Sequence, residues 1–98
     1  MAHQTSSEDH IKDPQAKLDY SIDWFEWLDA IGDTIATSTW TVSSGITISA
    51  SPPPSNTATN ATVWIEGGID GVYNATNTIT TVGGRVDERT ITIRVQNR

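Results

Sequence analysis

A strict alternation of apolar and polar residues begins at Leu18 and constrains this chain more than any other feature of its sequence. Leu18, Tyr20, Ile22 and Trp24 alternate with aspartate and serine. A period of two is typical of a strand with one buried and one solvent-facing side. The sequence therefore predicts a half-buried strand over residues 18–24 with an acidic outer face.

Similar strand patterns recur along the rest of the chain. Segments rich in β-branched residues occupy 34–42, 46–50, 59–65, 72–82 and 85–95, and glycine or proline clusters separate them. The prolines that follow residue 50 cannot donate to a strand ladder, so that run must be a loop or a sheet edge. In four of these segments, alternation places a set of side chains together on one face of the strand. The sets are Ala36, Ser38, Trp40 and Val42; Ile46, Ile48 and Ala50; Ala61, Val63 and Ile65; and Ile91, Ile93 and Val95.

Residues 25–33 interrupt the alternation. Phe25, Leu28 and Ile31 fall at spacings of three, which indicates a short helical turn or an irregular connection that ends at Gly32.

Six or seven short strands with turn signals at regular intervals predict an all-β fold, an immunoglobulin-like β-sandwich. A small open β-barrel is the alternative. Tyr73 stands at the start of the penultimate strand, where such sandwiches place a tyrosine corner. Ninety-eight residues suffice for one modest core. The predicted core residues are Tyr20, Ile22, Trp40, Trp64, Tyr73, Ile91 and Ile93.

The N-terminal segment differs from the rest. Residues 1–17 show no periodicity, and Pro14 biases the residue before it toward an extended backbone. We therefore expect an extended arm over residues 1–17 and a sandwich domain over 18–98.

The charge is acidic and uneven. A net charge of −6 argues against binding to a phosphate backbone, which needs clustered Lys and Arg. Residues 34–65 carry no charge, and four of the six basic residues lie between residue 85 and the C-terminus. The acidic N-terminal part and the basic last strand can meet within one protomer or between neighbours, or their charges are simply solvated.

Cysteine is absent from the sequence, which excludes disulfides and thiolate chemistry. No apolar run approaches the roughly 20 residues that span a bilayer, and the polar N-terminus lacks the apolar centre of a signal peptide. We expect no membrane partner, and a protein made in a cytoplasm and kept or assembled there.

The residues that carry chemistry are sparse. His3 and His10 lack neighbouring ligands for a metal. Trp24 and its aromatic neighbours interrupt the oxygen-ligand rhythm that a calcium loop would need among the aspartates of residues 19–33. Asp87-Glu88 beside an arginine resembles a charged strand face, and Ser43-Ser44 has no histidine in the predicted domain to activate it. We expect no catalytic residue, no metal site and no cofactor.

The remaining aromatic cluster is the candidate interface. Trp24, Phe25 and Trp27 fall where the first strand ends, and alternation cannot bury all three on one side. Because aromatic anchors are enriched at the centres of interfaces, we expect at least one of them to contact another subunit. Ile11 and Pro14 of the arm complete the candidate set.

The run from Ile11 to Val42 resembles the opening of small phage proteins known as fiber-tail adaptors, and the resemblance extends over about residues 12–95. It implies an immunoglobulin-like fold and a virion component of the neck or tail, and it brings no catalytic residues. The three prolines and the loop around Asn56 look peculiar to this chain. The motifs that carry the resemblance are Lys12-Asp13-Pro14, Leu18-Asp19-Tyr20, Ile22-Asp23-Trp24, Trp27-Leu28, Gly32-Asp33-Thr34-Ile35, Ser38-Thr39-Trp40, residues 61–68, Asn77-Thr78-Ile79-Thr80-Thr81, Gly83-Gly84-Arg85 and Asp87-Glu88-Arg89.

The function expected from this resemblance is assembly in the virion, by contacts with other neck, tail and fiber proteins and in a symmetric arrangement of many copies. The arm would lie along a neighbour and pair with an exposed strand edge. Two alternatives stay open at this point: a capsid-associated decoration module, and a carbohydrate- or host-binding module that uses exposed tryptophans.

Overall fold

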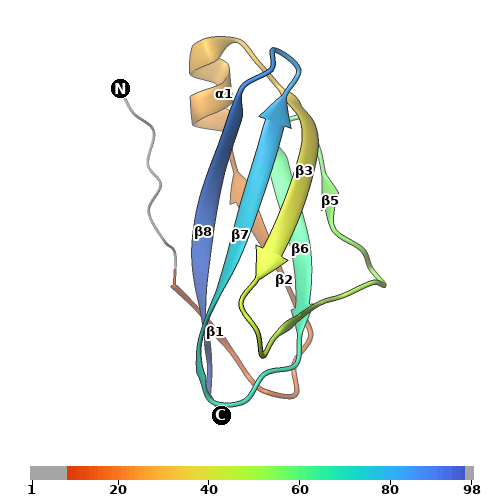
Figure 1. Cartoon of the computed structure of the whole chain (residues 1–98), viewed down its shortest axis with the longest axis vertical. Coiled ribbons are helices and arrows are strands. Elements are labelled where there is room, and N and C mark those ends of the chain that lie inside the picture. The colour runs from red at the N-terminus through yellow and green to blue at the C-terminus, as the bar shows by residue number, and fades with distance from the viewer. Residues whose placement is uncertain (1–8, 97–98) are drawn as a thin grey trace.

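Strands formed by the alternating segments pair into two sheets that face each other (Figure 1). The computed structural model describes residues 9–96. Within that range the elements are β1 (Asp9–Lys12), β2 (Leu18–Asp23), α1 (Phe25–Ile31), β3 (Ile35–Val42), β4 (Thr47–Ile48), β5 (Ser55–Asn56), β6 (Asn60–Glu66), β7 (Gly71–Thr81) and β8 (Val86–Val95).

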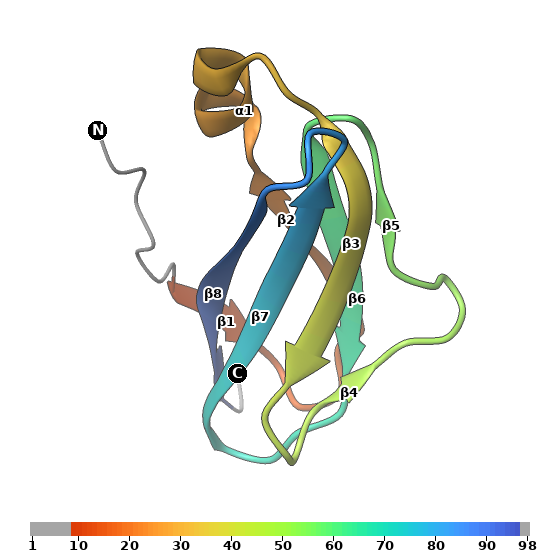
Figure 2. The same cartoon turned by 45° about the horizontal axis from the view of Figure 1, so that its top comes forward.

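The first sheet has the strand order β1-β8-β7-β3 and the second the order β2-β6-β4, with β5 paired to β6 beyond the end of β4. β1 runs parallel to β8, and the other pairs are antiparallel. Because the two sheets stay separate, the predicted sandwich is confirmed and the open barrel is wrong. The molecule measures 42 × 28 × 18 Å, and α1 lies at the same end of the long axis as the β7–β8 hairpin (Figures 1 and 2).

The core lies between the sheets and is built from every second residue of the long strands. Ile91, Ile93 and Val95 of β8 are buried, which confirms the inward face predicted there. On β6 the buried residues are Ala61, Val63 and Ile65, on the face opposite to the predicted core residue Trp64. Of the two alternatives predicted for residues 25–33, the helical turn is confirmed as α1, with Leu28 as its buried residue.

β3 departs from the predicted face at its start. A bulge lies between Ile35 and Thr37, so Ile35 is buried while Ala36 is exposed. An extra residue in one strand reverses the side to which the residues before it point, and the face resumes as predicted at Ser38. The predicted third strand is shorter than expected, because β4 ends at Ile48 and Ala50 is exposed in the turn before the prolines.

Tyr73 forms the expected corner. Its hydroxyl donates to the carbonyl of Ile69, 2.9 Å away and four residues upstream, which is the bond that defines a tyrosine corner. The Tyr73 ring packs against Gly45 of the β3–β4 turn, where a Cβ would stand 2.5 Å from Cε1 of the ring. Glycine is therefore required there both for space and for its φ of +111°.

β1 places a lysine inside the molecule. Lys12 is buried, and its Nζ donates to the carbonyls of Asp13 and Gly67 at 2.9 and 2.7 Å. Burial lowers the pKa of Lys12, because desolvation disfavours the charged form. Lys12 thus attaches β1 to the β6–β7 connection. β1 falls within the segment for which we predicted an arm, and residues 1–8 of that segment, with His3, lie outside the described residues.

Candidate interaction surface

α1 is positioned by the junction that precedes it. The carboxylate of Asp23 accepts the backbone N–H of Phe25 at 2.9 Å, which satisfies one of the free donors at the helix start. The helix ends at Gly32, whose φ of +66° is left-handed. Both boundaries therefore follow from local sequence.

Trp24 lies in the core and is removed from the candidate interface. Its side chain is fully buried, because it continues the inward face of β2. The Nε1 of Trp24 donates to Oδ1 of Asn77 at 2.9 Å, and the guanidinium of Arg89 stacks 4.3 Å from the ring centroid. A cation over an indole face is attracted by the ring quadrupole, so this contact fixes β8 against the base of α1.

Asn77 was not among the predicted core residues, yet it is fully buried on the inward face of β7. Its Nδ2 donates to the Ser38 hydroxyl and the Thr39 carbonyl at 2.8 and 3.0 Å. The signal was present, since Asn77 stands between two buried positions of the alternation, Ala75 and Ile79. A polar side chain at an inward position needs partners, and here it joins β7 to β3 and to the end of β2.

The other candidates occupy the surface to different extents. Phe25 and Ile11 are each 50% exposed. Trp27 is partly buried, packs on the core and lies 5.7 Å from the Trp24 ring, measured between centroids. Pro14 is half-buried. Phe25 therefore presents the largest exposed ring of the cluster.

The predicted core residues differ in how deeply they are buried. Tyr20, Ile22, Trp40, Ile91 and Ile93 are buried, and Tyr73 packs against the core while partly exposed. Trp64 is half-buried and stands outside the core cluster, opposite Asp19 in the register of β2 and β6. Its placement follows from alternation, because both neighbours of Trp64 in β6 face inward.

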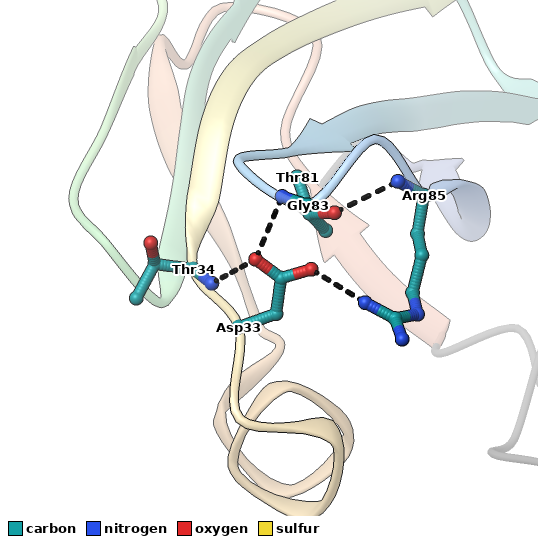
Figure 3. Close-up of polar contacts among 5 residues, drawn as sticks. All are labelled: Asp33, Thr34, Thr81, Gly83 and Arg85. Atoms are coloured by element: carbon teal, nitrogen blue, oxygen red, sulfur yellow. Dashed lines mark hydrogen bonds and ion pairs between the residues drawn. The ribbon is translucent and has the colours of Figure 1, made fainter.

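Asp33 ties the α1–β3 connection to the β7–β8 hairpin (Figure 3). Its Oδ1 accepts the backbone N–H groups of Thr34 and Gly83 at 2.9 and 3.1 Å, and its Oδ2 pairs with Nη1 of Arg85 at 3.0 Å. The Thr81 hydroxyl, which is the largest contributor, and these bonds together lower the pKa of Asp33 to about 2. We call this set of contacts the Asp33 clasp.

Side chains that could bind a metal are scattered in the part of the chain that the structure describes. No group of three or more metal-binding side chains occurs among the described residues. His10 packs edge-on against Tyr20, with ring centroids 4.9 Å apart. In residues 9–96 no helix is both long and apolar enough to cross a bilayer. The exposed apolar side chains of α1, the β7–β8 hairpin and β1 suit contacts with other proteins.

The comparisons with known proteins agree with this interpretation. A family model described as "Podophage GP4 fiber-tail adaptor protein gp77" matches residues 12–94, which run from the end of β1 to the end of β8. No curated protein matches the chain.

Proposed function

Since this chain belongs to the podophage GP4 fiber-tail adaptor family, we propose that it joins fiber to tail through side chains of α1 and β1. The family assigns the protein a structural role in the virion tail, with contacts to fiber and tail proteins, and no enzymatic activity. The observation that carries the proposal is the exposure of Phe25 and Ile11 on elements that the core holds rigidly.

The two contact sites lie in different parts of the molecule, as an adaptor between two partners requires. Ile11 stands opposite Arg94 in the register of β1 and β8, and Arg94 stands opposite Val72 on β7. Ile11 and Val72, which is 60% exposed, therefore flank one arginine on the outer face of the first sheet. Phe25 lies toward the other end of the long axis, where α1 is found (Figure 1).

We further propose that residues 1–17 act as an arm toward a neighbouring subunit and residues 18–98 as the body, with β1 as the part of the arm that is fixed to the body by its pairing with β8. The exposed Ile11 and the half-buried Pro14 are the proposed contacts of this arm that lie within the described residues. We also propose many copies in a symmetric arrangement, because repetition turns individually weak contacts into firm attachment through high effective concentration.

The test uses a phage whose own copy of this gene has been deleted, complemented with the wild-type protein, with Phe25→Ser or with Ile11→Ser. Each substitution removes an exposed apolar side chain and leaves the core intact. Negative-stain images of the particles should show fiber loss with at least one variant, while Thr41→Ser, at an exposed position of β3, leaves fibers in place. Full fiber occupancy with both variants would contradict the proposed contacts, and full occupancy without the gene would contradict the adaptor role.

A further inference from the structure

We propose that α1 and the β7–β8 hairpin form one docking surface for a basic, apolar patch on a different protein, an inference that rests on the proposed adaptor role. We define the α1–hairpin end as residues 23–33 and 82–89. These two segments are far apart in sequence and lie together at one end of the sandwich (Figures 1 and 2).

The apolar part of this surface comes from both elements. Phe25 is 50% exposed, Val82 70% and Val86 65%. The two valines flank the turn of the hairpin that contains Gly83-Gly84, a place where polar residues are the rule. Seven large hydrophobic side chains are exposed among the described residues, and these three share the α1–hairpin end.

The surface is held in one geometry. The Asp33 clasp bonds the segment after α1 to both Gly83 and Arg85 of the hairpin. Beneath α1, Arg89 stacks on the buried Trp24 and donates to the carbonyl of Asp23 at 3.1 Å. A surface that is ordered before binding loses less conformational entropy on association.

Charge selects the class of partner. The α1–hairpin end contains six carboxylates and two arginines, a net charge of −4 out of the −6 of the whole chain. Both arginines are engaged within the molecule, Arg85 by Asp33 and Arg89 by Trp24. Glu26 and Asp29, by contrast, are exposed on α1. Complementary potentials speed association and exclude partners of like charge, so the matching surface carries Lys or Arg.

The described part of a second copy, outside the α1–hairpin end, offers one exposed arginine to that surface, Arg94. Outside the α1–hairpin end, residues 9–96 contain three basic and five acidic side chains, so the rest of the described molecule is also negative. Lys12 is buried and Lys17 donates to the Ser51 carbonyl. The basic surface therefore belongs to one of the two foreign partners of an adaptor.

The experiment measures binding of the full-length protein to the fiber protein and to the tail protein of the same phage, each purified and immobilised. One variant removes charge, Glu26→Gln with Asp29→Asn, and another removes apolar surface, Val82→Ser with Val86→Ser. Each should weaken binding to the same one of the two partners by about tenfold or more, and the charge variant should also flatten the salt dependence of that binding. Asp70→Asn with Ile69→Ser, exposed residues of the β6–β7 connection, is the matched control and should bind this partner as the wild type does.

The outcomes separate this inference from the function on which it rests. Thermal unfolding and circular dichroism of each variant first establish that it folds. Wild-type protein that binds neither partner refutes the adaptor role. Wild-type binding to both partners, with no loss in either α1–hairpin variant, refutes the docking surface alone. Self-association that Val82→Ser with Val86→Ser abolishes would assign the surface to a second copy, and would equally overturn the inference.

Discussion

At the scale of single residues, the structure depends on a few polar groups that connect distant segments of the chain. Asn77 and Asp33 each bond to more than one partner, and each joins elements that are far apart in sequence. A buried polar group is stabilising only while its partners are present. Predictions about these residues therefore concern what is left behind when one partner is removed.

Replacing Asn77 with leucine should destabilise the protein by about 1–3 kcal/mol, because the Trp24 Nε1–H loses its acceptor inside the core. Urea unfolding followed by tryptophan fluorescence measures the change. Asn74→Ala, on the exposed side of the same strand, should change stability by less than about 0.5 kcal/mol. Equal effects of the two substitutions would argue against the role assigned to Asn77.

The Asp33 clasp predicts a specific acid sensitivity. The pKa of Asp33 in the folded state is about 2, against an ordinary value of 3.8. A depressed carboxylate pKa stabilises the fold above the ordinary value, and this contribution is lost as the pH falls toward the folded value. Between about pH 4 and pH 2 the urea midpoint of wild type should therefore fall more steeply than that of Asp33→Asn. Asp29→Asn, whose side chain is exposed, should follow the wild-type slope.

At the scale of elements, turns and junctions decide where the strands end and how the sheets close. The β3–β4 turn passes so close to Tyr73 that only glycine fits at position 45. The β7–β8 hairpin has a turn glycine of similar conformation, Gly84, with φ of +92° and open space around it. Comparing substitutions at Gly45 and Gly84 therefore distinguishes the cost of backbone strain, which both share, from that of a steric clash, which only Gly45 has.

Gly45→Ala should destabilise the protein by more than Gly84→Ala. Both substitutions place a Cβ on a left-handed backbone, which costs about 1 kcal/mol or more, and only the first also pushes on the Tyr73 ring. Thermal unfolding of the two variants beside wild type makes the comparison. If Gly84→Ala were the more harmful, the contact between the β3–β4 turn and the tyrosine corner would not limit this site.

At the scale of the whole molecule, nearly every strand pairs with one that is distant in sequence. β1 pairs with β8, β2 with β6 and β3 with β7, whereas the pairings of β7 with β8 and of β5 with β6 are local. Because loop closure must precede the distant pairings, sandwiches of this kind fold slowly. Refolding of the isolated protein should take milliseconds to seconds by stopped-flow tryptophan fluorescence, and a microsecond phase that accounted for the full amplitude would contradict the topology.

The distribution of the surface also belongs to this scale. Acidic and apolar side chains gather at the α1–hairpin end, while Ile11, Arg94 and Val72 form a row near the start of β7. An elongated body with distinct surfaces at two places suits a protein that must hold two others. The proposed adaptor role and the proposed docking surface both rest on this difference between the two ends of the molecule, and each has its own test.

Local sequence is enough to define most of the strands, their inward faces and the position of α1. Periodicity and turn signals depend only on residues that are close together in the sequence. The buried sets of β6 and β8 and the corner at Tyr73 were predictable in this way, and the motifs of residues 12–95 were enough to indicate the family. Two tryptophans were nevertheless assigned against the alternation of their own strands. Trp24 was a candidate for the interface and lies in the core, whereas Trp64 was predicted in the core and lies half-buried outside it.

Which distant groups meet depends on how the two sheets pack, and therefore on tertiary structure alone. Asp33 and Arg85 are 52 residues apart and Trp24 and Asn77 are 53 apart, and no local pattern relates them. The bulge in β3, the burial of Lys12 and the pairing of β1 with β8 likewise depend on which strands become neighbours. Alternation predicts which side chains of a strand face the core. The packing of the two sheets determines which other residues those side chains contact.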